Sequence, residues 1–389
     1  MKKAVLAILV ILFSILAVFI AYREIQDWRH QNYLNSLKTP AQIDEGINYI
    51  LDRYNVKGAS VAVIQDFHVL WAKGYGITDA ENPVPVSKNT LFDVASISKP
   101  VSAVAIIRVL HAKEISIDTE ANDLLTSWQI KENQFTDSVN VTVRHLLSHR
   151  GGINVDGYRG YIAQDTLPTL LHVLNGIPPA ENPKVEVIQT PGQSFMYSGG
   201  GYYILQQLLA DVTEKSFQTA LKNKLFDIIG MNNSTFRQDS LENYYESVAS
   251  GHYKGTLIKI KRMQFAGLAA AGLKSTAGDL ATFLSEIQRA LQGKSARLLD
   301  QESAKKLIFP ESEKYGLGFM LNGDFFGHGG ANVGFLSTMA AHVEKGYGIV
   351  VLTNSSRDDN LISLASDQSR REIIDLISRI YNWKTLPNF

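Results

Sequence analysis

The sequence contains no cysteine. Disulfide bonds, thiolate metal sites, a cysteine nucleophile and a lipid-modified cysteine are therefore all excluded. Neither sign of charge is in excess, because 38 lysine and arginine residues balance 38 aspartate and glutamate residues. A chain without net basic charge lacks the electrostatic footprint of a nucleic-acid-binding protein. We therefore expect no nucleic-acid partner.

Several common catalytic motifs are also missing. No phosphate-cradling glycine loop occurs, and the nearest approach to a Gly-x-Ser-x-Gly elbow, at residues 58–62, lacks its last glycine and lies in an expected strand. His145 and His149 are four residues apart, but the glutamate of a His-Glu-x-x-His zinc motif is absent and no third ligand is indicated. We expect neither a metal site nor a cofactor.

The first 22 residues differ in composition from the rest of the chain. Lys2 and Lys3 precede an apolar run from residue 4 to residue 21, which approaches the length of a membrane-spanning helix. No good small-x-small cleavage triplet follows, so we expect residues 1–22 to be an uncleaved anchor; cleavage would instead give a secreted protein. The lysines place the remaining chain outside the cytoplasm. Residues 23–40 are expected to form a polar and aromatic stalk.

Length and composition suit one large domain, because 45% of the 389 residues are hydrophobic and 20% are charged. Short runs rich in β-branched and aromatic residues predict strands, and apolar periodicity predicts helices. The predicted strands are 59–64, 69–76, 316–321, 334–342 and 348–353, and predicted helices include 43–51 and 373–377. This order predicts an α+β domain over 41–389, in which helices flank an antiparallel sheet from 41–90 and 310–389, with a large, mostly helical insertion at 91–309.

Ser96-Ile97-Ser98-Lys99 is the most informative stretch. Residues 89–95 before it are expected to be extended, and the apolar residues from Val101 onward predict a buried helix. Ser96 then starts the helix, and Lys99 follows on the same face. A half-desolvated lysine near the positive end of a helix has reason to lose its proton and act as a base for the serine hydroxyl. The same residues also fit a helix N-cap serine followed by a solvated lysine.

Two glycine-rich segments carry further candidates. In residues 191–202, Tyr197 can serve as a proton shuttle beside a cationic lysine, although the loop also fits turn glycines around a packing tyrosine. In residues 326–334, a predicted edge strand ends in glycines that let a substrate lie against the backbone, where an exposed N–H can donate to an oxyanion. His328 in this segment also fits ordinary loop chemistry.

In order and spacing, these three segments resemble the serine β-lactamase and penicillin-binding protein superfamily. The resemblance is to its class C branch, which contains class C β-lactamases, D-alanyl-D-alanine carboxypeptidases and family VIII-type esterases. It extends over roughly residues 41 to 383. Further matching segments are Thr142 to Gly152, Gly272 to Leu280 and Tyr315 to Phe319.

The resemblance implies a role for each motif residue. Ser96 matches the nucleophile and Lys99 its activating partner, while Tyr197 matches the tyrosine that relays protons to and from the leaving group. Water then deacylates the enzyme, with Tyr197 or His328 as its activator.

The third segment takes the place of the Lys-Thr-Gly strand motif of the family. The resemblance implies that Gly329 and Gly330 lie against the substrate beside His328. The backbone N–H groups of Ser96 and Ala331 would then form the oxyanion hole.

Two departures from the family pattern bear on the substrate. Gly199, in the substrate-binding region, stands where the second motif usually has asparagine, which removes an amide that holds the acylamino side chain of a β-lactam or peptide. His328 replaces the lysine of the third motif and provides a weaker, pH-dependent positive charge for a substrate carboxylate. Both departures argue against efficient β-lactam hydrolysis.

The resemblance therefore implies a serine hydrolase that forms a covalent acyl-enzyme on ester or amide substrates, of the esterase or D-amino-acid peptidase type. Its partner would be a small-molecule or cell-wall-derived acyl substrate. The alternatives are a β-lactamase, or a penicillin-binding receptor or scaffold at the cell envelope that is acylated without turnover.

Overall fold

The computed structural model describes residues 2–157, 160–162, 164–239, 241–243, 245, 247–258, 262–355 and 364–389. The side chains of residues 2–8, 10, 242 and 364–366 lie outside the described part, and those of 2–8 and 10 belong to the expected anchor. The longer helices are α1 (Lys2–Ser36), α2 (Ile43–Arg53), α3 (Ser98–Ala112), α7 (Gly199–Thr213), α11 (Ala277–Leu291), α12 (Gln301–Leu307) and α13 (Leu364–Ile380). The shorter ones are α4 (Ala121–Leu124), α5 (Val143–Leu147), α6 (Leu170–Asn175), α8 (Phe217–Leu221), α9 (Asp227–Ile229) and α10 (Leu268–Ala271), with single turns η1 (Pro40–Gln42), η2 (Ala95–Ile97), η3 (Lys222–Phe226) and η4 (Leu241–Asn243).

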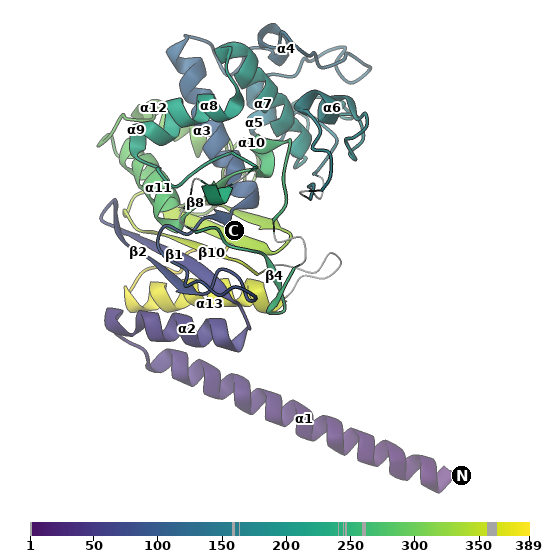
Figure 1. Cartoon of the computed structure of the whole chain (residues 1–389), viewed down its shortest axis with the longest axis vertical. Helices are drawn as coiled ribbons and strands as arrows, with labels where there is room; N and C mark the ends of the chain where they lie inside the picture. Colours follow the sequence, from purple (N-terminus) through teal and green to yellow (C-terminus); the bar gives the residue numbers. More distant parts are fainter. Residues whose placement is uncertain are drawn as a thin grey trace.

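A six-stranded antiparallel sheet lies at the centre of the molecule (Figure 1), with the strand order β2-β1-β10-β9-β8-β7. Its strands are β1 (Gly58–Gln65), β2 (His68–Gly76), β7 (Met320–Asn322), β8 (Phe325–Asn332), β9 (Phe335–His342) and β10 (Gly348–Thr353). Two short pairs lie outside it: β3 (Phe92–Asp93) with β6 (Lys274–Ser275), and β4 (His252–Tyr253) with β5 (Thr256–Leu257). In the main sheet β1 pairs with β10, placing Ala59 opposite Thr353. This pairing joins the two ends of the folded region and confirms the predicted α+β fold.

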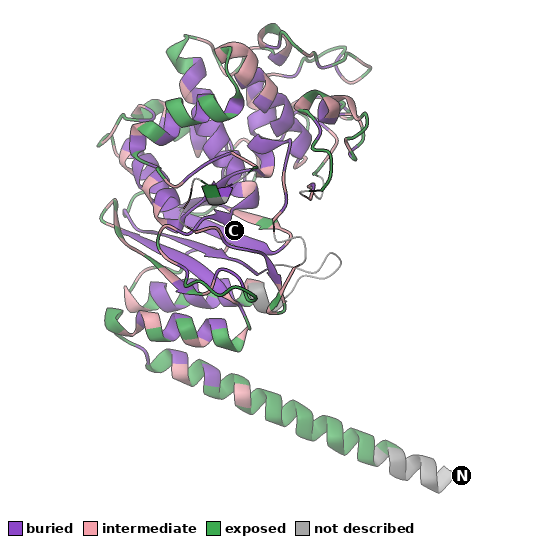
Figure 2. Cartoon of the chain, viewed as in Figure 1, coloured by how far each residue is buried: buried purple, intermediate pink, exposed green. Residues whose placement is uncertain are grey.

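Both faces of the sheet are covered, as the alternation along β1 illustrates. Ala62 and Ile64 belong to the core under the helical region, whereas Val61 and Val63 belong to the core under α2 and α13. Successive strand residues point to opposite faces, so both sets must be apolar. Figure 2 shows the sheet buried between α11 and the helices above it and α13 and α2 below. Each fully buried valine or isoleucine contributes about 1.5–3 kcal/mol.

Four of the five predicted strands are confirmed, as β1, β2, β9 and β10. The strand predicted at 316–321 is wrong over most of its length, because β7 covers Met320–Asn322. Gly318 has φ +85°, and a Cβ there would lie 2.6 Å from the Cβ of Ala103. The chain therefore turns tightly against α3 before β7 begins.

The helix α1 continues through the region expected to be a stalk. It runs unbroken to Ser36, and its N-terminal part extends away from the body (Figure 1). Near its end His30 and Leu34 are buried, and His30 Nε2 lies 2.8 Å from Glu372 Oε2 of α13. Packing against the domain thus starts before residue 41. Within the described part of the chain no helix has both the length and the apolar character for crossing a membrane.

Candidate active site

The three predicted segments meet at one cleft of about 600 Å³ beside the part of β8 that lies beyond its pairing with β7. Residues predicted for the site that line this cleft are Ser96, Lys99, Tyr197, His328, Gly329, Gly330 and Ala331. They come from the start of α3, the loop before α7, and β8. Folding therefore gathers residues from three distant parts of the chain, and the two groups proposed for the oxyanion hole belong to the same cleft.

Ser96, the predicted nucleophile, lies in a tight turn just before α3. Ala95 has φ +48°, a left-handed conformation that is costly for a residue with a side chain. Its N–H donates to Asp93 Oδ1 at 3.1 Å, and its carbonyl accepts from Ser98 Oγ at 2.6 Å. These bonds hold the strained turn. Ser96 therefore lies in the turn η2, and α3 itself begins at Ser98, two residues later than predicted.

Lys99 is directed at the hydroxyl group of Ser96. Its Nζ lies 3.1 Å from Ser96 Oγ and 2.9 Å from the carbonyl oxygen of Ala270 in α10, and the residue is 2% exposed. The ring centre of Tyr197 is 4.7 Å from the same Nζ. A solvated lysine is thereby excluded. The geometry is that of a nucleophile and base within hydrogen-bond reach, with a phenol beside them.

His149 holds the loop that carries Tyr197. Its carbonyl accepts from Met196 N at 2.8 Å, and its Nδ1 accepts from Ser198 N at 3.1 Å. The rings of His149 and Tyr197 are 4.3 Å apart. Burial lowers the pKa of His149 well below its usual value, with Lys99 and His328 adding to the effect, so the ring is neutral and Nδ1 is free to accept.

This positioning role of His149 was missed at the sequence level, where the residue was weighed as a zinc ligand. Its companion His145 is engaged elsewhere, since its Nδ1 accepts from Thr142 N at 3.3 Å. Among the described residues no group of three or more histidine, aspartate or glutamate side chains is placed to hold a metal.

His328 is a neutral hydrogen-bonding residue, not the pH-dependent cation that we expected. Its Nδ1 lies 2.5 Å from the carbonyl oxygen of Gly329 and must donate to it, so Nε2 accepts from the Tyr315 hydroxyl at 3.2 Å. Burial, with the nearby Lys99 ammonium, lowers the pKa of His328 to about 3. Burial also raises the pKa of Tyr315 well above its usual value, which keeps its proton in place.

The low pKa of His328 predicts acid lability. In the unfolded chain His328 takes up a proton near pH 6.5, whereas in the folded protein it does so only near pH 3. The contribution of neutral His328 to the free energy of unfolding is therefore fully present above pH 6.5 and is lost as the pH falls toward 3. We expect the free energy of unfolding to lose up to about 1.4 kcal/mol per pH unit in this window through His328. Urea unfolding at pH 7, 6 and 5 measures the slope.

In this experiment His328→Gln should show a shallower dependence of unfolding free energy on pH than wild type. The matched control is His68→Gln, because His68 is exposed and lies outside the cleft. Equal slopes for wild type and His328→Gln would contradict the assignment.

Gly329 and Gly330 of β8 allow the backbone of two other segments to approach closely. A Cβ at Gly330 would lie 2.3 Å from the carbonyl oxygen of Val94, just before the turn that contains Ser96. A Cβ at Gly329 would lie 2.2 Å from the carbonyl oxygen of Phe389, which also lines the cleft. Thr338 Oγ1 donates to Asn388 Oδ1 at 2.7 Å and so fixes the C-terminal segment there. Both glycines are explained by packing, a role that the resemblance did not indicate.

Gly329→Ala is therefore expected to destabilise the fold by about 1–3 kcal/mol, because the added methyl group displaces the C-terminal segment. Gly157→Ala is the matched control, since Gly157 lines the same cleft but a Cβ there has no neighbour within 4 Å. Urea unfolding of the two variants measures the difference. Equal stability of Gly329→Ala and Gly157→Ala would show that the C-terminal segment at Phe389 moves aside without a cost in free energy.

Gly199 lies behind the cleft rather than in its lining. Its N–H donates to the carbonyl of Asp156 at 2.8 Å, and a Cβ at Gly199 would lie 2.6 Å from that oxygen. Asp156 itself lines the cleft. The backbone of residue 156 thus occupies space that a side chain at position 199 would need, so a larger residue there would require this backbone to shift.

A buried ion pair, also missed at the sequence level, supports both the turn that contains Ser96 and β8. Lys274 Nζ lies 2.8 Å from Asp93 Oδ2, and both side chains are 2% exposed. Asn332 Nδ2 donates to Asp93 Oδ1 at 2.8 Å. Asp93 therefore connects β6, the end of β8 and the turn before Ser96. The family-like segment around Lys274 was recognised, but nothing local indicated its partner.

Comparison with known proteins agrees with the family resemblance seen in the sequence. The family model described as Beta-lactamase matches residues 43–365. Protein flp of Staphylococcus aureus (strain MRSA252) is 24% identical over 321 residues, which cover 80% of this chain and 62% of that protein. The chain thus spans about three-fifths of the length of the curated relatives it matches first.

Solved structures share the fold. The octameric penicillin-binding protein homologue from Pyrococcus abyssi has a TM-score of 0.69 and 25% identity, covering 89% of this chain and 79% of that one. The D-amino acid amidase from Ochrobactrum anthropi SV3, complexed with D-phenylalanine, has a TM-score of 0.67 and 20% identity, covering 87% and 99% of the two chains. At this identity the amidase demonstrates the fold alone.

Proposed function

Because this chain belongs to the beta-lactamase family, whose fold is that of serine hydrolases, we propose that it hydrolyses ester or amide substrates through an acyl-enzyme at Ser96. The activity would be of the esterase or D-amino-acid peptidase type. One observation carries the proposal: the buried Lys99 Nζ lies 3.1 Å from Ser96 Oγ at an open cleft.

The proposed mechanism uses the deprotonated form of Lys99 as the base. Its Nζ accepts the Ser96 proton while Oγ attacks the substrate carbonyl, and the N–H groups of Ser96 and Ala331 stabilise the oxyanion. Tyr197, beside Nζ, passes the proton to the leaving group, and the leaving group departs from the acyl-enzyme.

Water then attacks the acyl-enzyme, and we assign its activation to Tyr197. Of the two candidates, His328 is the poorer base because both of its ring nitrogens are engaged and its pKa is about 3. A residue that is protonated only near pH 3 also carries no positive charge for a substrate carboxylate at neutral pH. The neutral ring and the lack of an amide at Gly199 favour simple esters and amides over β-lactams.

The test is turnover by the purified full chain. We expect hydrolysis of short-chain p-nitrophenyl esters or of D-phenylalanine amide, with nitrocefin turned over at least about tenfold more slowly in kcat/KM, a difference of about 1.4 kcal/mol. Faster nitrocefin turnover would identify a β-lactamase instead. Labelling by a fluorescent penicillin without turnover of any substrate would contradict the hydrolase proposal and identify an acyl-accepting receptor or scaffold.

A location outside the cytoplasm is also part of the proposal. It is supported by Lys2 and Lys3 ahead of the apolar run that ends at residue 21. Protease added to intact cells, with outer membranes permeabilised where present, should digest the domain, and a cytoplasmic marker should survive. Protection equal to that of the marker would contradict this location.

A further inference from the structure

A second pocket lies at the opposite end of the two helices that carry the catalytic segments. It has a volume of about 610 Å³ and is bounded by the C-terminal ends of α3 and α7, by η3, and by residues 296–300. A helix of 15 residues such as α3 is about 22 Å long. The pocket is therefore separate from the cleft at Ser96, and no mechanistic role accounts for it.

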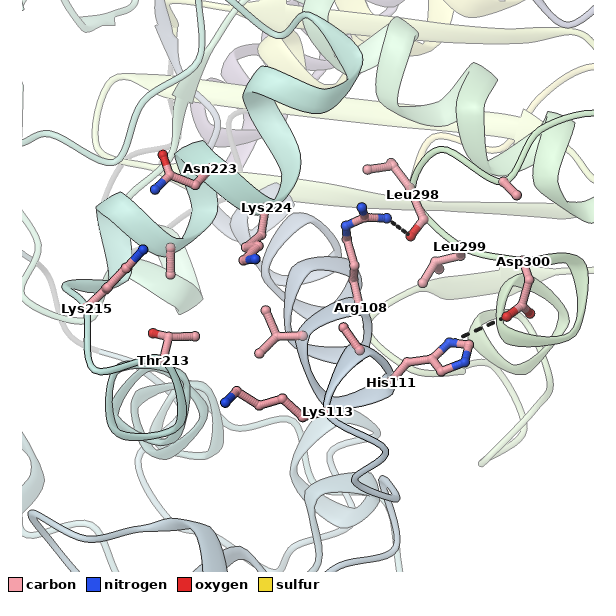
Figure 3. Close-up of a pocket in the computed structure, with 14 residues that line it drawn as sticks. Arg108, His111, Lys113, Thr213, Lys215, Asn223, Lys224, Leu298, Leu299 and Asp300 are labelled. Carbon is pink, nitrogen blue, oxygen red and sulfur yellow. Dashed lines mark hydrogen bonds and ion pairs between the residues drawn. The ribbon is translucent and has the colours of Figure 1, made fainter.

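Four cationic side chains line this pocket: Arg108, Lys113, Lys215 and Lys224. Figure 3 shows the three lysines around the open space, with Arg108 at its side. Among the described residues, no carboxylate pairs with any of the three lysines. This local excess of positive charge contrasts with the balanced charge of the whole chain.

Acidic groups near the pocket do not neutralise it. Of the described residues that line the pocket, Asp300 alone is a carboxylate; its Oδ2 lies 3.4 Å from His111 Nδ1, and its Oδ1 accepts from Ser303 N at 2.7 Å. Hydrogen bonding to Ser303 N lowers the pKa of Asp300, so it carries one negative charge against four positive ones. Glu114 and Glu214 are neighbours in sequence but do not line the pocket.

Helix dipoles explain part of this arrangement. Lys113 and Lys215 follow the C-terminal ends of α3 and α7, where cations are favourable. Arg108 lies inside α3, and Lys224 belongs to η3, so this explanation leaves both unaccounted for.

Arg108 is fixed in place, as a binding residue should be. Its Nη1 donates to the carbonyls of Arg297 and Leu298, both at 2.6 Å. Because an arginine is a planar fork with several donors, one held nitrogen leaves the remaining donors in a set orientation. Thr213 and Asn223 add neutral polar groups to the lining.

We propose that this pocket binds a phosphate-bearing anion. Four cations around one pocket suit a multiply charged group better than a single carboxylate, and guanidinium and ammonium groups both bind phosphate oxygens well. The volume exceeds the needs of one phosphate, which favours a ligand with linked phosphates. The site leaves the Ser96 cleft open, so it is independent of the proposed hydrolase activity.

The test is isothermal titration calorimetry of the full chain with inorganic phosphate and, separately, with tripolyphosphate. We expect Lys113→Gln/Lys215→Gln/Lys224→Gln to bind at least about tenfold more weakly than wild type. The matched control, Lys222→Gln/Lys314→Gln/Lys345→Gln, removes the same charge from residues that do not line the pocket and should bind like wild type. Thermal unfolding verifies that all three proteins are folded.

The two anions and the two triple variants distinguish the possible explanations of binding. Pocket-dependent binding of inorganic phosphate supports a single phosphate group as ligand, and pocket-dependent binding of tripolyphosphate alone supports linked phosphates. Absence of binding to wild type overturns the proposal. Equal weakening in both triple variants also overturns it, because diffuse surface charge would then explain the binding.

Discussion

Replacement of Ser96 by alanine is expected to lower kcat/KM by at least about 10⁴-fold, because the attacking oxygen is lost while the cleft remains. Losses of this order follow removal of the nucleophile in other serine hydrolases. The rate that persists would come from binding and from the oxyanion hole. Steady-state hydrolysis of the preferred substrate measures the loss. Intact mass after fluorophosphonate treatment should show one probe on wild type and none on Ser96→Ala.

The control for this experiment is Ser116→Ala. Ser116 is exposed, lies outside the cleft, and accepts one bond from Asp118 N at 3.1 Å, so its loss should leave turnover within about twofold of wild type. Thermal unfolding of Ser96→Ala close to that of wild type would exclude misfolding as the cause. Turnover by Ser96→Ala at the wild-type rate would disprove the acyl-enzyme proposal.

The fold was predictable where its signals are local. Strands β1 and β10 could be recognised from their β-branched residues, and α2 from its apolar spacing. The end of α1 carried a helical signal as well, because buried His30 and Leu34 are four residues apart and buried Leu37, directly after the helix, follows three residues later. The polar and aromatic composition of this stretch led us instead to expect a stalk.

The strand predicted at 316–321 failed for a nonlocal reason. Gly318 turns because α3 approaches it at Ala103, and Tyr202 of α7 also lies close, with its hydroxyl 3.2 Å from a Cβ built at the glycine. The alternation around this glycine is typical of a strand. Contacts with α3 and α7, which no local pattern records, decide the outcome.

The candidate site likewise combines local contacts, which the sequence predicts, with long-range contacts, which it does not. The proximity of Ser96 and Lys99 follows from three residues of helical spacing, so a motif could predict it. The contact between His149 and Ser198 spans 49 residues, and that between Asp93 and Lys274 spans 181. The charge state of His328 depends on how deeply the fold buries it, so the sequence suggested a titrating cation where the protein holds a neutral ring.

Replacement of Lys274 by methionine is expected to lower the free energy of unfolding by about 3–5 kcal/mol, because it leaves the Asp93 carboxylate buried without its cation. Such a loss is a large part of the stability of an ordinary domain. Asp93 also accepts from Ala95 N and Asn332 Nδ2, so the turn before Ser96 and the end of β8 should loosen together. Urea unfolding at pH 7 measures the first effect, and kcat/KM the second.

Lys73→Met is the matched control, because Lys73 and Asp44 form a comparable pair at 2.7 Å with both side chains about half exposed. Its loss should cost at most about 1 kcal/mol, since water replaces the partner. Adding Asp93→Leu to Lys274→Met should recover part of the lost stability by removing the stranded charge, but no activity, because the turn then lacks its acceptor. A loss for Lys274→Met no larger than that for Lys73→Met would mean that Asp93 finds another partner or takes up a proton, and that the pair does not hold the nucleophile turn.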